Sequence, residues 1–228
     1  VAQALRHYHR HEVIGLNHMP RDSRVLVVVN HSLATYDIVL LMTAFYTELK
    51  RLPRPLIDRL FFRIPYLGDL TQHFGAVQGS PEAARHLLES EELVTVAPGG
   101  MREALRPSTE RYQIRWDKRY GFVKLAMEAQ APIVLAACPK ADDVYEVYEN
   151  PVTSYFYKRF KVPIFLARGI GPTPLPRPVK LVHMLSEPIQ PPEPGSTERE
   201  HEKRAKAFHA QLVKRMHELI SEAIQYRG

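Results

Sequence analysis

The stretch VLVVVNHSLATYD, residues 25–37, decides the fold, because an uninterrupted apolar run gives way to a polar turn and then to a helix-like segment. Five consecutive apolar residues at 25–29 predict a strand buried on both faces, which is typical of parallel sheets. Residues 37–49 have the length and composition of a helix that follows it. The turn between them would lie at the carboxyl end of the strand, where open α/β sheets bind ligands.

Two side chains in this stretch have the chemistry of a general base, His31 and Asp37. A neutral imidazole accepts a proton near pH 7, and a nearby carboxylate orients the ring and stabilises its cationic form. The same pair also fits a capping or core histidine and an acidic residue favoured by the helix N-terminus. The pair alone leaves both interpretations open.

A second polar turn, APGGMRE at residues 97–103, follows the apolar run at 93–96. The backbone N–H groups near Gly99 and Gly100 are candidate donors to an oxyanion, and Arg102 supplies a planar cation suited to phosphate or carboxylate. A plain tight turn uses the same residues. This turn supports a site only in combination with the first.

Strands and helices are predicted to alternate along the rest of the chain. Ser80 and Pro81 open a predicted helix that runs to Ser90, and a short apolar helix is expected at 56–62. The other expected elements are a strand at 93–97, a helix at 121–129, strands at 133–137 and 179–185, and a C-terminal helix opened by Thr197. The expected fold class is therefore α/β, a single domain with a mostly parallel central sheet and helices on both faces.

The C-terminal helix is expected to pack on the domain through an apolar stripe formed by Phe208, Leu212, Met216, Leu219, Ala223 and Ile224. We expect three regions: an N-terminal lead-in at 1–24, a core at 25–188, and a proline-rich connection with the C-terminal helix at 189–228. The cluster RHYHRH at 6–11 is expected to be solvated surface, and no metal site is expected there or elsewhere.

Composition narrows the class of partner. Among 228 residues, 45% are hydrophobic, which suffices for a full core, and the net charge of +6 favours anionic partners such as acidic lipid surfaces or cofactor phosphates. No RNA-binding signature or zinc spacing is present, so nucleic acid is not expected. The single cysteine, Cys138, lies in an apolar run and is expected to be a buried strand residue in a reducing compartment.

Membrane contact is suggested by one further segment, YFYKRFK at 155–161, which mixes aromatic and basic side chains of the kind found at a membrane interface. A helix that packs its aromatic side chains inward is the other interpretation. No apolar run reaches the ~20 residues that cross a bilayer. The chain starts at Val1 without a methionine, so an upstream membrane anchor stays open.

Taken together, the motifs resemble the glycerolipid acyltransferase superfamily, the lysophosphatidic acid acyltransferase-like proteins, and more closely the branch related to diacylglycerol acyltransferases. The resembling blocks are Asn30-His31 with Asp37, residues 74–80, residues 97–103, and residues 120–126 followed by 131–134. This resemblance implies transfer of a fatty acyl group from a thioester, acyl-coenzyme A or an acyl carrier protein, to a hydroxyl of a lipid acceptor. It implies no bound cofactor and a peripheral location on the cytoplasmic face of a membrane.

In this resemblance, His31 is the general base and Asp37 its partner. The expected substrate-binding residues are Asn30, Ser32, Gly99, Gly100, Arg102, Glu103 and Arg106. Two departures from the usual motifs matter. Five residues separate His31 from Asp37 instead of four, so that Tyr36 occupies the usual carboxylate position, and Gly99 replaces the glutamate of Pro-Glu-Gly-Thr-Arg. The Pro-Gly-Gly form favours a neutral glycerolipid acceptor over lysophosphatidate.

Two other functions remain open from the sequence. A lipid hydrolase or thioesterase would use the same pocket with water as acceptor, and a variant of this idea makes Ser32 the nucleophile. No Gly-x-Ser-x-Gly elbow surrounds Ser32, which disfavours that variant. A non-catalytic membrane lipid-binding domain of the same fold is the second alternative.

Overall fold

The computed structural model describes residues 2–58, 75–149 and 166–227. Its strands are β1 (Glu12–Ile14), β2 (Val25–Val29), β3 (Arg54–Ile57), β4 (Val77–Gln78), β5 (Leu93–Val96), β6 (Ile133–Ala137), β7 (Glu146–Tyr148), β8 (Leu166–Arg168) and β9 (Val182–Leu185). Its helices are α1 (Ala2–Tyr8), α2 (Tyr36–Ala44), α5 (Pro81–Glu89), α6 (Gly100–Ala104), α7 (Gly121–Ala129) and α9 (Glu198–Gln225). Four short helical turns complete the set, η1 (Leu16–His18), η2 (Phe45–Leu49), η3 (Ser108–Glu110) and η4 (Pro139–Asp143).

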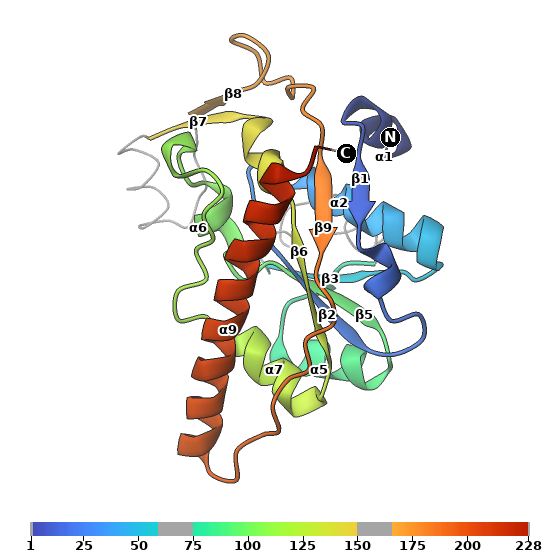
Figure 1. Ribbon diagram of the computed structural model, residues 1–228, viewed down its shortest axis with the longest axis vertical. Helices are drawn as coiled ribbons and strands as arrows, with labels where there is room; N and C mark the ends of the chain where they lie inside the picture. The colour runs from blue at the N-terminus through green and yellow to red at the C-terminus, as the bar shows by residue number, and fades with distance from the viewer. Residues whose placement is uncertain (1, 59–74, 150–165, 228) are drawn as a thin grey trace.

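The described strands form a seven-stranded sheet in the order β1-β9-β6-β2-β5-β3-β4, and β7 pairs with β8 outside it (Figure 1). The pairs β6–β2, β2–β5, β5–β3 and β3–β4 are parallel. β9 runs antiparallel to β6, and β1 is parallel to β9. The prediction of a mostly parallel sheet is therefore confirmed, with two reversed strands at one side.

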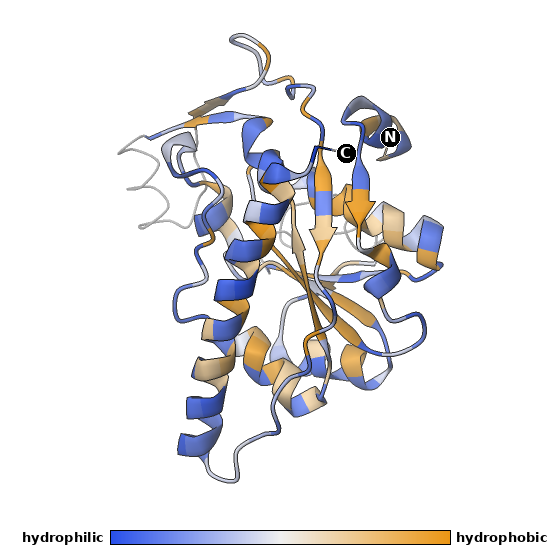
Figure 2. Ribbon diagram, viewed as in Figure 1, coloured by the Kyte–Doolittle hydropathy of each residue, from blue (hydrophilic) through white to orange (hydrophobic). Residues whose placement is uncertain are grey.

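Helices cover both faces of this sheet, and β2 supplies the centre of the core. Leu26 and Val28 pack toward α5, α7 and α9, whereas Val25, Val27 and Val29 pack toward α2 and the π-helical turn η2. All five side chains are at most 1% exposed, and each fully buried aliphatic side chain stabilises the fold by about 1.5–3 kcal/mol. Figure 2 shows the apolar strands in the middle and the hydrophilic outer side of α9.

Several predicted boundaries agree with the structure because local signals specify them. Val25–Val29, Gly121–Ala129 and Ile133–Ala137 have the predicted bounds. The Ser80 hydroxyl accepts the N–H of Ala83 at 3.1 Å, which caps α5 as predicted. The predicted helix at 37–49 is present, but its last turn is π-helical and ends at Lys50 with a φ of 57°.

The C-terminal helix α9 is also capped as predicted, since the Thr197 hydroxyl accepts the N–H of Glu200 at 3.2 Å. Its predicted apolar stripe is buried except for Ile224, which is 40% exposed at the end of the helix. The predicted helix at 56–62 is wrong at its start, because Leu56 and Ile57 pair with β4 as part of β3. Residues 59–62 and the segment 155–161 lie outside the described residues.

Residues 1–24 do more than lead into the core. β1 adds an edge strand beside β9, with Glu12 opposite Val182 and Ile14 opposite Met184. α1 packs against α2. Within the described ranges, none of the helices is both long enough and apolar enough to span a bilayer.

Candidate active site

The candidate site forms where the carboxyl ends of three neighbouring parallel strands meet. His31 follows β2, Glu103 and Arg106 belong to the turn and helix α6 that follow β5, and Asp142 lies in η4 after β6. β9 runs in the opposite direction and adds His183 at the same edge, since its neighbour Met184 pairs with Ala137. Parallel strand order thus assembles side chains that are up to 152 residues apart (183 − 31).

Two buried charged side chains hold the backbone of His31. The N–H of His31 donates to Glu103 Oε1 at 2.6 Å, and its carbonyl oxygen accepts from Arg106 Nη1 at 2.7 Å. Glu103 is 0% exposed and Arg106 is 4% exposed. Because both backbone groups form charge-assisted hydrogen bonds, the backbone of His31 is held in place without any contact made by its ring.

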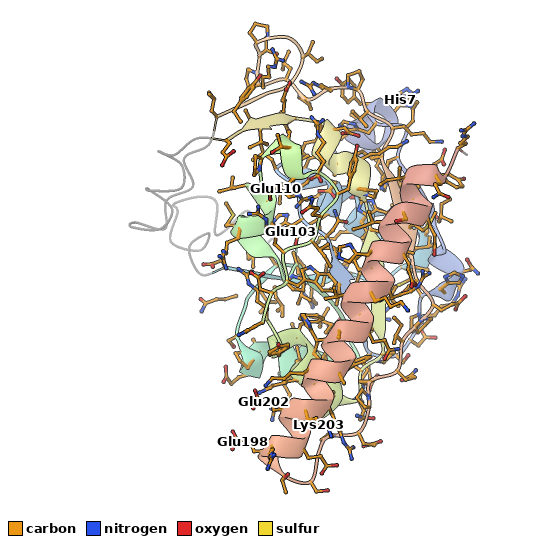
Figure 3. The ribbon with its side chains drawn as sticks, turned by 60° about the vertical axis from the view of Figure 1, so that its left-hand side comes forward. His7, Glu103, Glu110, Glu198, Glu202 and Lys203 are labelled. Atoms are coloured by element: carbon orange, nitrogen blue, oxygen red, sulfur yellow. The ribbon has the colours of Figure 1, made fainter. Side chains whose placement is uncertain are left out.

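Glu103 is itself held from a second side, because the N–H of Arg115 donates to its Oε2 at 2.6 Å. Gly99 is required for this arrangement, since a Cβ at that position would overlap the Glu103 side chain. Figure 3 shows Glu103 on α6. Burial raises the pKa of the Glu103 carboxyl, and the N–H groups of Arg115 and His31 oppose that change.

Arg106 completes a buried ion pair with Asp142, in which the two side chains are 3% and 7% exposed. Asp142 also accepts the N–H of Tyr112 at 2.8 Å. Burial raises the pKa of the Asp142 carboxyl, and the Arg106 guanidinium opposes this rise. The pair links the turn after β6 to the backbone of His31.

The imidazole of His31 is nearly enclosed, with the residue 9% exposed. Its Nδ1 atom has no hydrogen-bond partner among the described residues, and neither has the hydroxyl of Ser32. Burial, and secondly the positive charge of Arg106, lower the pKa of His31 to about 4. The ring is therefore neutral at pH 7 and holds a lone pair that can accept a proton.

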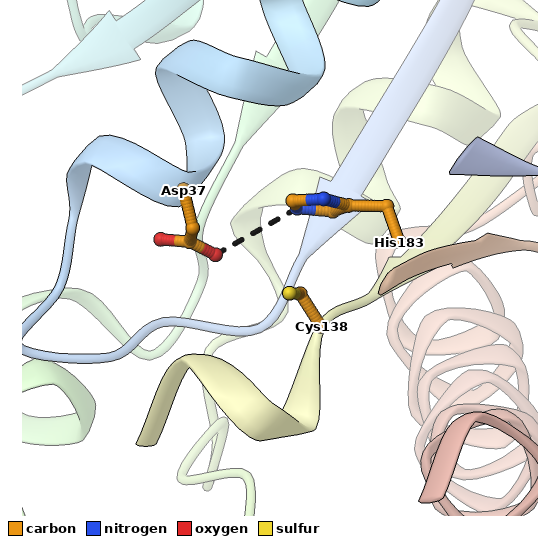
Figure 4. Close-up of side chains that lie close together, drawn as sticks. All are labelled: Asp37, Cys138 and His183. Atoms are coloured by element: carbon orange, nitrogen blue, oxygen red, sulfur yellow. Dashed lines mark ion pairs between the residues drawn. The ribbon is translucent and has the colours of Figure 1, made fainter. Parts of the chain in front are cut away.

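Asp37 lies at the start of α2, but the structure does not place it in hydrogen-bond contact with His31. Its Oδ2 faces His183 Nε2 at 3.7 Å, and its Oδ1 has no partner in the described part of the chain (Figure 4). Burial raises the pKa of Asp37 to about 8. His31 and Asp37 are thus not hydrogen-bonded to each other in this arrangement, because the Asp37 carboxyl group turns toward β9.

Asp37, Cys138 and His183 are the described side chains that come nearest to a metal-ligand set, with their ligand atoms within 4.8 Å of one another (Figure 4). The hydrogen bonds of His183 argue against that use. Arg6 Nε donates to His11 Nδ1 at 3.2 Å, so a neutral His11 carries its proton on Nε2 and donates it to His183 Nδ1 at 2.9 Å. His183 then carries its own proton on Nε2, where a metal would need a lone pair.

His183 is not among the residues predicted from the sequence, and two of the N-terminal histidines are not at the surface as predicted. His9 is 0% exposed and His11 is 9% exposed, so the prediction of a solvated cluster at 6–11 is wrong for these two residues. Each is buried because it has a hydrogen-bond partner inside the molecule. A histidine within the apolar run at 181–185 was the signal for His183, since a lone polar residue in a buried strand needs such a partner.

Most residues predicted to bind substrate make contacts inside the molecule. The amide of Asn30 joins β2 to β6, because its Oδ1 accepts the N–H of Cys138 at 2.7 Å. The N–H of Gly100 donates to Ala97 at 3.0 Å and is therefore not free for an oxyanion. Glu103 and Arg106 hydrogen-bond to the backbone of His31. Arg102 and Ser32 differ from these residues, because the Arg102 side chain is 59% exposed beside Asp117 and the Ser32 hydroxyl has no partner among the described residues.

Described residues line a smaller and a larger recess, and of these two the smaller is lined by residues of the candidate site. The smaller is lined by residues that include Leu33, Arg106, Asp142 and Tyr145, and it has room for about one water molecule. The larger is a groove between α9 and the segment after β9, lined by residues that include Ser186, Lys214 and Arg215. Neither includes His31 in its lining.

Known proteins similar to this chain were found by sequence. A profile of the family described as diacylglycerol acyltransferase matches residues 30–226. A human protein named "DGAT1/2-independent enzyme synthesizing storage lipids" is 30% identical over 183 residues, which cover 80% of this chain and 54% of that protein. An uncharacterised protein of Mycobacterium tuberculosis is 29% identical over 199 residues, which cover 83% of this chain and 54% of that protein. The chain thus spans about half the length of the curated relatives it matches.

A solved structure with a similar fold was also found. It is the 1-acyl-sn-glycerophosphate (LPA) acyltransferase PlsC from Thermotoga maritima, with a TM-score of 0.55 and 14% sequence identity. The match covers 94% of this chain and 76% of that chain. The expected α/β architecture is confirmed by this likeness together with the strand order.

Proposed function

Since this chain belongs to the diacylglycerol acyltransferase family, we propose that it is an O-acyltransferase. It moves a fatty acyl group from a thioester donor, acyl-coenzyme A or an acyl carrier protein, to the hydroxyl of a glycerolipid. Membership of the family confirms the resemblance drawn from the sequence motifs. The donor, the acceptor and the residue roles below belong to the proposal.

In the proposed reaction, His31 accepts the proton of the acceptor hydroxyl as its oxygen forms a bond to the acyl carbon. The tetrahedral intermediate then collapses, the carbon–sulfur bond breaks, and the thiolate takes the proton back from the imidazolium. The acyl group passes directly between the two substrates. No residue of the chain becomes acylated.

The observation that carries this proposal is the combination of a neutral imidazole with an immobilised backbone at His31. The Glu103 and Arg106 hydrogen bonds at 2.6 and 2.7 Å fix the backbone of this residue. A general base must be held in place to act on a bound hydroxyl, because a misplacement of about 1 Å can cost about 100-fold in rate. Every buried backbone N–H and carbonyl needs a partner, and at His31 these partners are a buried anion and a buried cation, which hold it more strongly than neutral groups would.

Asp37 is proposed as the residue that stabilises the imidazolium of His31. Asp37 Oδ1 and His31 Nδ1 are both buried without hydrogen-bond partners in the described residues. They are complementary as acceptor and donor once His31 becomes protonated. An ionised carboxylate in this buried surrounding would raise the pKa of His31 from its low resting value.

A neutral glycerolipid is the proposed acceptor. The Pro98-Gly99-Gly100 turn lacks the glutamate of the Pro-Glu-Gly-Thr-Arg motif, and its exposed cation, Arg102, is shared with Asp117 at 3.4 Å. The human relative is named for the synthesis of storage lipids. A neutral acceptor needs no dedicated phosphate site, which agrees with this turn.

Peripheral membrane association is proposed for the surface near β8. Leu166, Ile170 and Leu175 are 57%, 46% and 60% exposed, and Tyr148 of β7 contributes a ring that is 37% exposed. Arg168 lies over the Tyr148 ring at 5.8 Å. Exposed apolar side chains beside an arginine suit the boundary between lipid headgroups and acyl chains. We call this set of five residues the β8 patch.

The test is an acyl-transfer assay with labelled acyl-coenzyme A species and a panel of lipid alcohols, read by mass spectrometry. His31→Ala is expected to lower turnover by about 10²- to 10⁴-fold. His217→Ala, which replaces an exposed histidine on α9, is expected to leave turnover unchanged. Wild-type activity in the His31→Ala protein would refute the mechanism.

The same assay separates the alternatives. Release of free fatty acid without an added alcohol would identify a hydrolase or thioesterase, and its loss in Ser32→Ala would assign the nucleophile. Lipid binding without transfer or hydrolysis would identify a non-catalytic lipid-binding domain. A phosphatidate product would overturn the neutral acceptor but keep the acyl-transfer chemistry.

A further inference from the structure

The start of helix α2 is held by a chain of polar side chains from the N-terminal segment and β9, none of which belongs to the acyltransferase motifs of the sequence. Arg6 comes from α1, His11 immediately precedes β1, and His183 is in β9. This series of polar side chains ends at Asp37, one of the two proposed catalytic residues. Its members are separated by up to 177 residues (183 − 6) but meet in the interior.

The direction of each hydrogen bond in this chain follows from the chemistry of its first member. A guanidinium has no acceptor, so Arg6 Nε donates to His11 Nδ1 at 3.2 Å. Burial, followed by the charges of Arg6 and His9, lowers the pKa of His11 to about 4, so the ring is neutral. The His11 proton is therefore on Nε2 and is donated to His183 Nδ1 at 2.9 Å.

His183 is neutral for a similar reason, because burial and the neighbouring His11 lower its pKa. With Nδ1 accepting from His11, the proton of His183 is on Nε2. That N–H faces Asp37 Oδ2 at 3.7 Å, which is longer than a hydrogen bond but close enough for its dipole to stabilise a carboxylate (Figure 4).

A parallel contact holds the preceding residue. His9 Nδ1 donates to the carbonyl of Val179 at 2.8 Å, so its Nε2 accepts from the hydroxyl of Tyr36 at 2.8 Å. At the start of α2, His9 thus bonds Tyr36 directly, whereas His11 reaches Asp37 only through His183. Both ring nitrogens of His9 and of His11 have partners, which is consistent with their burial.

We propose that Arg6, His11 and His183 form a one-directional chain of N–H donors that positions the carboxylate of Asp37 and favours its ionised form. The inference rests on the proposed function, because Asp37 assists His31 only as a carboxylate. His183 and His11 are positioning residues, since they act through Asp37 and not on a substrate.

Other charged or titratable groups also surround Asp37. Cys138 lies beside it at the end of β6 with a thiol whose pKa is raised by burial, and Tyr36 precedes it on α2. Asp142 and Arg106 act on it from η4 and from the turn after α6 with opposite signs. Among these groups, the N–H of His183 is the donor that a substitution can remove without disturbing the backbone of His31.

The first test needs no activity and uses ¹⁵N NMR of the imidazole rings in the wild-type chain. The proposal requires a proton on Nε2 in both His11 and His183 and on Nδ1 in His9, which serves as the internal reference for the opposite tautomer. A proton on Nδ1 of His183 would overturn the proposal. It is also the tautomer that a metal ion bound at Nε2 would require.

The second test compares His183→Phe, which removes the N–H, with His183→Gln, which keeps a side-chain N–H donor. The proposal expects His183→Phe to move the lower limb of the kcat pH profile upward by about one pH unit, which costs about tenfold at neutral pH, with little change in KM. His183→Gln should restore most of this loss. His209→Gln, at another buried histidine on α9, should leave the profile in place.

Two results of the second test would overturn the proposal: an unmoved pH profile in folded His183→Phe protein, or equal losses in the Phe and Gln variants. If the wild-type chain transfers no acyl group, the proposed function fails while this inference remains testable. In that case the carboxyl ¹³C resonance of Asp37 is followed with pH, and its midpoint should be higher in His183→Phe than in wild type and His183→Gln.

Discussion

Glu103 Oε1 accepts the backbone N–H of His31 at 2.6 Å across a separation of 72 residues. This contact joins the turn after β2 to the helix after β5, so that the two polar turns recognised in the sequence form one structural unit. The acidic residue of the second turn therefore supports the base of the first. Its charge is compensated by the Arg115 N–H and by the neighbouring Arg106.

Replacing Glu103 with glutamine should destabilise the candidate site, although the two side chains have nearly the same shape. Both carboxylate oxygens accept backbone N–H groups, and the amide would aim its own N–H at one of these donors. We expect a loss of about 1–3 kcal/mol in the free energy of unfolding and a lower kcat, measured by urea denaturation and the acyl-transfer assay. Glu110→Gln is the control, because the Glu110 side chain is 39% exposed and faces Arg115 at the surface. Equal effects of the two substitutions would contradict the assigned role.

The Arg106–Asp142 pair should behave as a buried ion pair. Asp142→Asn leaves the Arg106 guanidinium without its counter-charge in the interior, which is expected to cost about 3–5 kcal/mol of stability. Asp117→Asn breaks the Arg102 pair, whose side chains are both 59% exposed, and should cost at most about 1 kcal/mol. Thermal and urea unfolding of the two variants measure the contrast. A loss below about 1 kcal/mol in Asp142→Asn would show that this pair is not a structural element.

Acidification should destabilise the chain through its buried neutral histidines. His11 and His31 have pKa values of about 4 in the folded chain against an ordinary value of 6.5. Between these values the unfolded state binds more protons, so the free energy of unfolding falls as the pH falls from 6.5 to 4. Each such histidine lowers the free energy of unfolding by at most about 1.4 kcal/mol per pH unit of acidification.

The titration of Asp37 changes the free energy of unfolding in the opposite direction over an overlapping pH range. Its folded pKa of about 8 exceeds its ordinary value of 3.8, so the folded state holds the extra proton and gains stability as the pH falls from 8 to 4. Because two such histidines oppose this one carboxyl, urea unfolding between pH 7 and 5 should show a net decrease in the free energy of unfolding on acidification. The loss should be smaller in His11→Gln and unchanged in His217→Gln. Identical pH dependence in wild type and His11→Gln would contradict the buried neutral state.

The β8 patch should contribute to lipid binding. Leu166→Asp combined with Leu175→Asp removes two exposed apolar side chains and adds two negative charges, which should reduce sedimentation with anionic phospholipid vesicles by at least about tenfold. Tyr46→Asp is the control, because Tyr46 is 59% exposed on η2, outside the patch. Unchanged binding of the double variant, or equal loss in the control, would remove this surface from the proposal.

Local sequence signals determined the elements of the fold. The apolar run at 25–29, the Ser80 and Thr197 caps, and the helix at 121–129 have the predicted positions because each depends on neighbouring residues. The two polar turns were also recognisable from sequence, since residue types that carry chemistry follow directly after buried strands. The family resemblance drawn from these turns was confirmed.

Tertiary structure alone decided what most of those polar residues do. The parallel pairing of β2 with β5 and β6 brings Glu103, Arg106 and Asp142 to the backbone of His31, and the reversed strand β9 brings His183 to Asp37. Whether a buried charge touches substrate or a distant backbone depends on strand order, which one-dimensional patterns do not specify. Burial then changes the protonation of these groups, because desolvation acts on a side chain only once the whole fold has closed around it.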